Sequence, residues 1–242
     1  MVFARSAAMA FNRYIDRNID AKNPRTADRE IPAGVIKPNH ALFFVVANAI
    51  GFIVAAGMIN TLCLLLSPVA LFIIFFYSYS KRFTALCHVI LGIGLGLAPV
   101  GAYVAVTGSF SLPVILIGLS VVFWVAGFDI IYALQDDDFD ESQQLHSIPV
   151  WLGRASALKL SRVFHLITAI TLGTAAFILF QSLQWIGWVS IFGVLFFISS
   201  LIYQHLLVSE NDLSKVNRAF FTTNGIASLV FGILICVDYF LV

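Results

Sequence analysis

Charged residues are scarce in this sequence. Asp, Glu, Lys and Arg make up 11% of the 242 residues, whereas about 25% is usual for a soluble domain. So few charges cannot cover a water-facing surface, which excludes an ordinary soluble protein. In contrast, 60% of the residues are hydrophobic and the mean hydropathy is +0.94. These values predict a protein that lies in a lipid bilayer.

The sequence also lacks an excess of either charge. Its 14 Lys and Arg residues nearly balance its 13 Asp and Glu residues, and no basic patch of the kind that binds nucleic acid is present. The three cysteines, Cys63, Cys87 and Cys236, lie within apolar runs. Because they have no metal-type spacing, they indicate neither a disulfide framework nor a zinc site. We interpret them as small hydrophobic side chains.

Long apolar runs make up most of the chain. The hydrocarbon core of a bilayer is about 30 Å thick and a helix rises 1.5 Å per residue, so one crossing needs about 20 apolar residues. Seven stretches meet this criterion, which predicts an all-α, multi-pass helix bundle. The predicted spans are residues 41–59, 61–79, 84–107, 112–134, 155–180, 185–207 and 220–241.

The distribution of charge predicts how the bundle is oriented. We expect every Lys and Arg to lie on one side, in the opening segment and in alternate connections. The acids share that side except Asp238, and the connections around Asn60, Ser109 and Ser182 carry no charge. Since loops rich in Lys and Arg stay in the cytoplasm, we place the charged face there, on a cytoplasmic (inner) membrane.

The opening segment, residues 2–20, is predicted to be a helix that is too short to span a membrane. It lacks the basic start, apolar core and cleavage site of a signal peptide, in that order. We interpret it as the cytoplasmic half of a further span whose beginning lies outside the sequence.

One polar motif lies at the end of this opening helix. The run NRYIDRNID spaces Asn12, Asp16 and Asp20 four residues apart. On a helix, successive members turn by about 40° and rise by about 6 Å. The amide and both carboxylates therefore line one stripe.

A second polar motif follows at the end of the fourth predicted span. In DIIYALQDDDFD, the residues Asp129, Tyr132, Asp136 and Asp140 fall within about 80° of one another if the helix continues. Asp129 lies inside an apolar stretch, where an ionised carboxylate is costly unless it faces a polar cavity or a cation. Acids at span ends, such as Asp137, are interpreted instead as solvated.

Together the two motifs predict a magnesium site. Carboxylate and amide oxygens are ligands that suit Mg²⁺, which also retains positions for water and phosphate oxygens. The candidate catalytic residues are Asp16, Asp20, Asp129 and Asp136. The candidate metal ligands are Asn12, Asp16, Asp20, Asp129, Asp136 and Asp140.

Basic residues near these carboxylates indicate that the ligand is a diphosphate, since cations neutralise the charge that develops when diphosphate leaves. Alternatively, individual basic residues only anchor the chain at the membrane surface. The candidates for diphosphate binding are Arg25 and Arg29 in NPRTADREIPAG, with Tyr77, Lys81 and Arg82 in YSYSKRFT.

Two other features receive structural interpretations. Gly92, Gly94 and Gly96 in LGIGLGLAPVG lie within a span, where we expect them to pack helices together rather than to bind a nucleotide. His88 lies near the cytoplasmic end of the same span, and a structural role is favoured over a catalytic one.

The two motifs, with NPRTADREIPAG and YSYSKRFT between them in the same order, resemble the UbiA family of intramembrane prenyltransferases. GFDIIYALQDDDFDE followed by HSIPVWLG is most similar to the 4-hydroxybenzoate polyprenyltransferase branch of ubiquinone and menaquinone biosynthesis. Family members are described with nine transmembrane helices, and the first motif ends the second of them. The resemblance therefore implies that residues 1–242 form one domain that lacks the first helix and part of the second.

The resemblance also implies a reaction and its partners. A polyprenyl diphosphate binds through magnesium held by both Asp motifs, its allylic carbon–oxygen bond ionises, and the ring of an aromatic acid attacks the carbocation. For 4-hydroxybenzoate, a cation must hold the carboxylate of the acceptor. Arg5, on the helical face of Asn12, is the candidate for this cation. Tyr132 is the other candidate for acceptor binding.

Other functions stay open at this point. Homogentisate, dihydroxynaphthoate or haem would be the acceptor in related enzymes. A cation-coupled transporter is an alternative of a different class, because intramembrane carboxylates also mark ion pathways. Against it, the candidate groups cluster at one membrane face, whereas transporters bind their substrates near the midplane. An inactive fragment is the third alternative.

Overall fold

Helices form most of the chain in its computed structural model, which describes residues 1–183 and 186–241. Within these residues, seven helical segments are long and apolar enough to cross a membrane, which confirms the predicted all-α bundle. The elements are α1 (Val2–Asp20), α2 (Pro38–Ile59), α3 (Thr61–Ser80), α4 (Cys87–Thr107), α5 (Leu112–Ala133), the short α6 (Asp137–Ser142), α7 (Ile148–Ser182), α8 (Trp188–Leu207), the π-helical segment η1 (Arg218–Thr223) and α9 (Asn224–Leu241).

The predicted spans match these helices closely, except at the start of α7. This helix begins at Ile148 rather than at residue 155, because a short helical segment precedes Gly153. Gly153 has a φ of 75°, which interrupts the helical backbone and which glycine adopts without strain. The sixth predicted span begins at residue 185, which lies outside the described residues. The corresponding helix, α8, is described from Trp188.

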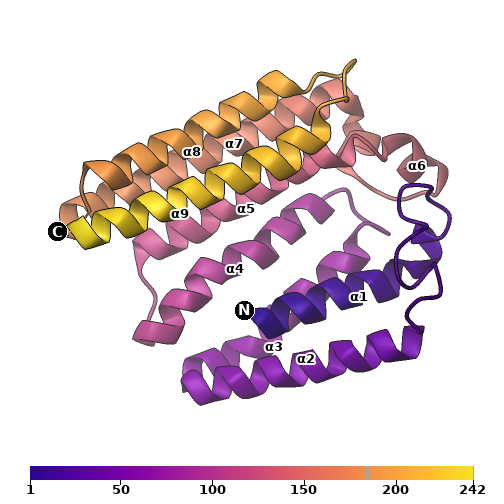
Figure 1. Cartoon of the computed structure of the whole chain (residues 1–242), viewed down its shortest axis with the longest axis horizontal. Coiled ribbons are helices and arrows are strands. Elements are labelled where there is room, and N and C mark those ends of the chain that lie inside the picture. Colours follow the sequence, from indigo (N-terminus) through magenta and orange to yellow (C-terminus); the bar gives the residue numbers. More distant parts are fainter. Residues whose placement is uncertain (184–185, 242) are drawn as a thin grey trace.

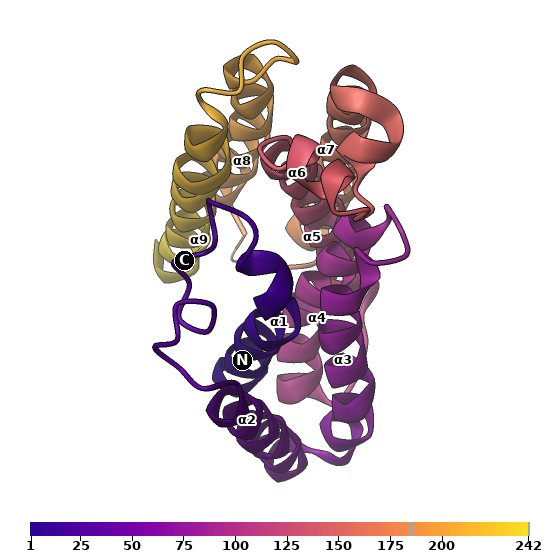
Figure 2. The ribbon, with the colours of Figure 1, turned by 90° about the vertical axis from the view of Figure 1, so that its right-hand side faces the viewer.

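The helices lie in two groups that meet along α5. In Figure 1, α5, α7, α8 and α9 run side by side in the upper part of the molecule, and α1 to α4 form the lower part. The most extensive helix packing joins α5 to α7 on one side and to α4 on the other. Figure 2 looks along the bundle and shows α1 beside α2 and α3, against both of which it packs.

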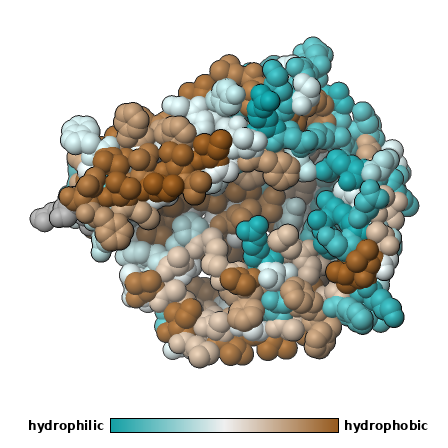
Figure 3. Space-filling view, in the orientation of Figure 1, coloured by the Kyte–Doolittle hydropathy of each residue, from teal (hydrophilic) through white to brown (hydrophobic). Residues whose placement is uncertain are grey.

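Hydrophilic residues gather at one end of the bundle. In Figure 3 they cover the right-hand end, where Figure 1 shows α6 and the connection between α1 and α2. Large apolar side chains such as Phe43, Phe72 and Phe177 remain exposed along the helices, as expected of a lipid-facing surface. Arg5 departs from the expected clustering of basic residues, because its place on α1 is about 22 Å along the helix axis from Asp20.

Two glycines allow α4 and α5 to approach each other closely. A Cβ atom added to Gly92 would lie 2.2 Å from the carbonyl oxygen of Val122, and one added to Gly96 would lie 2.7 Å from that of Gly118. Since neither separation is sterically possible, any larger residue would force the two backbones apart. The structure therefore confirms that these two glycines pack helices together.

This packing predicts that Gly92→Ala lowers the melting temperature of the protein in detergent, because overpacking a well-packed contact costs about 1–3 kcal/mol. Gly94→Ala is the matched control on the same helix. Its Cβ would meet no atom closer than Ile74 Cγ1, at 4.0 Å, and alanine favours the helix. Equal melting temperatures for the two variants would contradict the close crossing of α4 and α5.

Candidate active site

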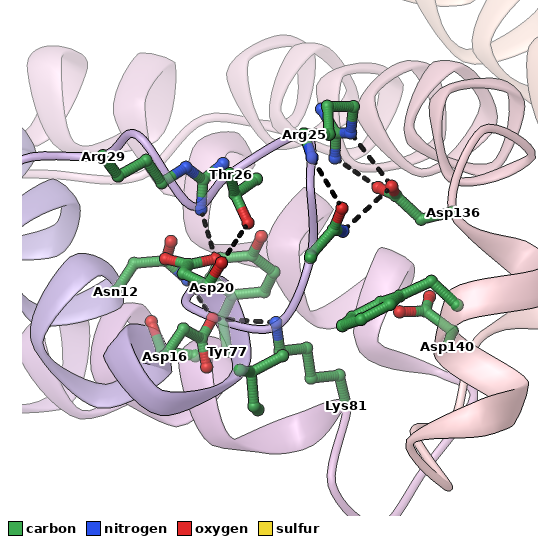
Figure 4. Close-up of a pocket in the computed structure, with 14 residues that line it drawn as sticks. Asn12, Asp16, Asp20, Arg25, Thr26, Arg29, Tyr77, Lys81, Asp136 and Asp140 are labelled. Atoms are coloured by element: carbon green, nitrogen blue, oxygen red, sulfur yellow. Dashed lines mark hydrogen bonds and ion pairs between the residues drawn. The ribbon is translucent and has the colours of Figure 1, made fainter. Parts of the chain in front are cut away.

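A cavity of about 150 Å³ lies at the hydrophilic end of the bundle. Its wall is formed by the end of α1, the following loop of residues 21–37, the end of α3, the segment that joins α5 to α6, and α6 itself. Figure 4 shows polar side chains from these segments around this space. The polar lining residues are Asn12, Asp16, Asp20, Asn23, Arg25, Thr26, Arg29, Tyr77, Ser78, Lys81, Asp136 and Asp140.

Asp16 contributes the most buried carboxylate of the cavity wall, with 1% of its surface exposed. A buried carboxylate costs several kcal/mol unless it is paired. Lys81 Nζ and an Arg82 guanidinium nitrogen each lie 2.9 Å from a different Asp16 oxygen. The side-chain amide of Asn12 also donates to Asp16, at 3.2 Å. Lys81 and Arg82, directly after α3, therefore neutralise the Asp16 carboxylate.

Asp20 lies one helical turn beyond Asp16 and is 4% exposed. The Arg29 guanidinium donates to its Oδ1 at 2.7 Å. Its Oδ2 is buried and has no hydrogen-bond partner among the described residues. An anionic oxygen in this state is a ready ligand for a further cation.

Asp136 faces the first motif from the segment between α5 and α6. Arg25 binds both oxygens of this carboxylate through its guanidinium, with Nε at 2.9 Å from Oδ1. The same guanidinium donates to the Tyr132 hydroxyl at 2.6 Å. The Tyr132 ring is stacked on Phe220, at 4.1 Å between ring centroids. Loop 21–37 is thereby fastened to α5.

The second motif does not form the continuous helical stripe that the sequence predicted. Helix α5 ends at Ala133, and α6 begins only at Asp137. Because the chain leaves the helix between them, Asp136 can turn to Arg25, while Asp129 stays within α5 and contacts His88. Asp129 is therefore not among the residues that line the cavity.

Asp140 lines the far side of the cavity and stands apart from the ion pairs in Figure 4. Burial raises the pKa of its carboxyl to about 6, although the nearby positive charge of Lys81 opposes this effect. Near pH 7 the group is mostly ionised, and its charge is a second open position for a cation.

Three other residues that the sequence predicted for the site, Arg82, Arg5 and Tyr132, do not line the cavity. Arg82 contacts Asp16 together with the backbone carbonyl of Ile15, so it supports the first motif without lining the space. Arg5 is exposed near the start of α1. Tyr132 touches the site through Arg25.

Sequence reasoning missed two buried polar residues of loop 21–37. Asn23 accepts a hydrogen bond from the Arg25 backbone at 2.9 Å and donates to Asp136 at 3.3 Å. The Thr26 hydroxyl donates to the Asp20 carbonyl at 3.1 Å. An Asn–Pro pair is a recognised turn signal, so residues 23 and 24 did indicate where the loop bends back over α1.

The donor set of this cavity fits magnesium in its chemistry. All of the candidate ligands offer hard oxygen atoms, and one of them, Asp20 Oδ2, is buried without a partner among the described residues. Within the same part of the chain, no three Asp, Glu, His or Cys side chains converge closely enough to be a preformed metal centre. Basic side chains hold the carboxylates instead.

The raised pKa of Asp140 predicts a pH-dependent effect of Asp140→Asn on stability. Ionising a carboxyl whose folded-state pKa is raised costs free energy in the folded state. As the pH rises from about 4 to 6, the wild type should therefore lose about 2 kcal/mol relative to the variant. Melting temperatures should converge near pH 4, and the variant should melt higher above pH 6.

Glu141→Gln is the control for this experiment, because Glu141 is exposed on the same short helix. It should follow the wild-type profile. A constant difference between Asp140→Asn and the wild type across the pH range would contradict the assignment.

Comparisons with known proteins agree with this arrangement. The model of the UbiA prenyltransferase family matches residues 1–226. The chain is 30% identical over 228 residues to the 4-hydroxybenzoate octaprenyltransferase of Citrobacter koseri, covering 94% of this chain and 76% of that one. It is 29% identical over 229 residues to the enzyme of the same name from Salmonella paratyphi B, with the same coverage.

Solved structures show the same fold. A UbiA homologue from Aeropyrum pernix, in its apo form, superposes with a TM-score of 0.86 at 33% identity, covering 98% of this chain and 86% of that one. A UbiA homologue from Archaeoglobus fulgidus, bound to GPP and Mg²⁺, has a TM-score of 0.68 at 21% identity over 98% of this chain and 84% of that one. The family match decides against the transporter alternative. The chain belongs to the UbiA family and is a multi-pass membrane prenyltransferase.

Proposed function

We propose that this prenyltransferase moves a polyprenyl group from a polyprenyl diphosphate to 4-hydroxybenzoate in quinone biosynthesis, with Mg²⁺ as cofactor. The observation that carries the proposal is the set of buried carboxylates and basic side chains around one cavity. The acceptor follows the names of the Citrobacter and Salmonella relatives. The metal follows the donor set, supported by the Archaeoglobus structure with GPP and Mg²⁺.

Arg25, Arg29 and Lys81 would bind the diphosphate. All three line the cavity, and each contacts a carboxylate of the same wall. A diphosphate that enters the cavity would be an alternative partner for these three basic side chains. Their charges would then stabilise the negative charge that grows on the diphosphate as its bond to the allylic carbon breaks.

Magnesium would be held by oxygens of Asn12, Asp16, Asp20, Asp136 and Asp140, and it would neutralise the diphosphate while this group leaves. Three of these carboxylates, those of Asp16, Asp20 and Asp136, contact Lys81, Arg29 and Arg25 respectively. We therefore expect that these basic side chains pass from the carboxylates to the diphosphate as metal and substrate bind together.

The allylic cation would react with the ring carbon ortho to the hydroxyl group of 4-hydroxybenzoate, and loss of a ring proton would restore aromaticity. Tyr132 presents an aromatic ring near the cavity, with Phe220 stacked on it and Arg25 at 5.2 Å from its centroid. Arg5 remains the proposed partner of the acceptor carboxylate, on the same face of α1 as Asn12.

The cavity would face the cytoplasm of a cell with this chain in its inner membrane. It lies at the end that carries the basic loops, and such loops remain on the cytoplasmic side. Homogentisate, dihydroxynaphthoate and haem are the acceptors to compare with 4-hydroxybenzoate.

The proposal predicts that membranes containing the chain convert radiolabelled 4-hydroxybenzoate into a lipid-extractable product when a long-chain polyprenyl diphosphate and Mg²⁺ are supplied. A chelator should abolish the product, and excess Mg²⁺ should restore it. Labelled product with another aromatic acceptor alone would correct the substrate but leave the prenyltransferase assignment intact. Product formation that persists in chelator would contradict the metal requirement.

The same assay predicts that Asp16→Asn lowers the transfer rate by about 100-fold or more, because it removes a charge that contacts Lys81 and that would hold the metal. Asp28→Asn is the matched control, since Asp28 is exposed on loop 21–37 and does not line the cavity. It should transfer at the wild-type rate. A wild-type rate for Asp16→Asn would show that the carboxylates of α1 are not part of the site.

A further inference from the structure

A buried histidine, His88, is paired with the partly buried Asp129 near the candidate active site. His88 is 3% exposed, and its Nδ1 lies 2.7 Å from Asp129 Oδ2. On the other side of the ring, Nε2 lies 3.3 Å from the backbone nitrogen of Ile148. One imidazole therefore joins α4, α5 and the first residue of α7.

These two contacts fix the position of the ring proton. A backbone N–H can only donate, so Nε2 accepts from Ile148 and carries no hydrogen. A carboxylate oxygen accepts, so Nδ1 carries the hydrogen and donates to Asp129. The contact with Ile148 also satisfies one of the N–H groups that a helix leaves free at its start.

Asp129 is left with one oxygen held by His88 and one oxygen open. Its side chain is 18% exposed, and its hydrogen bonds within the described residues are those of Oδ2 alone. Asp129 precedes Tyr132 by one turn of α5, and the Tyr132 hydroxyl contacts Arg25, which lines the cavity. Asp129 thus lies one turn deeper in the bundle than this contact, with a free oxygen in an apolar helix.

We propose that His88 is a positioning residue that acts through Asp129. By donating to Oδ2 it holds the carboxylate in one orientation, so that Oδ1 stays available to the magnesium and diphosphate of the substrate. A side chain that is already oriented loses less conformational entropy when it binds a metal ion. This inference rests on the proposed function, because it assigns Asp129 to the same substrate site.

Two substitutions of His88 separate its two hydrogen bonds. In His88→Asn, the shorter amide can place its nitrogen near the position of Nδ1, which keeps a donor for Asp129 and loses the acceptor for Ile148. In His88→Gln, the longer amide can place its oxygen near Nε2, which keeps the acceptor for Ile148 and loses the donor for Asp129. A positioning role through Asp129 requires that His88→Asn be the better enzyme.

The first measurement needs no acceptor. Purified wild type should be protected against heat by GPP together with Mg²⁺, and the concentration of Mg²⁺ needed for half of this protection is the readout. We expect it to rise by about 10- to 100-fold in His88→Gln and by less than about threefold in His88→Asn. Melting temperatures without ligand report the separate effect of losing the Ile148 contact.

The second measurement is the tautomer of His88 in the wild type, from nitrogen NMR of the protein with labelled histidine and His88→Asn as the assignment control. The expected spectrum shows a neutral ring with hydrogen on Nδ1. Hydrogen on Nε2 alone would overturn the proposal, because the donor to Asp129 would be absent. This measurement is informative even if a His88 variant fails to fold.

The outcomes distinguish this inference from the proposed function. Equal Mg²⁺ requirements in the two variants, or the higher requirement in His88→Asn, would assign His88 a purely structural role and overturn the inference. If protection follows the expected order but no product forms from 4-hydroxybenzoate, the inference holds and the acceptor is wrong. If GPP with Mg²⁺ gives the wild type no protection, both fail.

Discussion

The cost of burying the Asp16 carboxylate organises the hydrophilic end of this protein. Lys81 and Arg82, directly after α3, supply the compensating charge. The Arg82 guanidinium also donates to the Ile15 carbonyl, which ties this side chain to the backbone of α1. In the same way, Arg29 of loop 21–37 supplies the compensating charge for the Asp20 carboxylate. The contacts that stabilise the acids thereby gather basic side chains around one cavity.

Close packing in the apolar part of the bundle supports the polar chemistry at its end. His88 precedes Gly92 by one turn of α4, and Asp129 follows Val122 by two turns of α5. Because Gly92 lets these antiparallel backbones nearly touch, a side chain as short as histidine reaches across to the carboxylate. The glycine contact and the His88 hydrogen bond are therefore parts of one arrangement.

The sequence predicted those features that depend on local periodicity. Apolar run length located the spans, and four-residue spacing placed Asn12, Asp16 and Asp20 on one stripe. Periodicity did not predict the break after Ala133 or the partner of Asp129, because both depend on distant parts of the chain. His88 is 41 positions from Asp129, and Asn23 is 113 positions from Asp136. Spacing alone can place a side chain on a helical face, but the partner across the bundle follows from tertiary packing.

The pairing of Asp16 with Arg82 has a consequence for the synthesis of the protein. The two residues are 66 positions apart, and chains grow at about 5–20 residues per second, so several seconds pass before the acid meets its partner. During this interval Asp16 lacks the two cations that offset the cost of burying its carboxylate. The end of α1 should therefore reach its final position only after residues 81 and 82 have been synthesised.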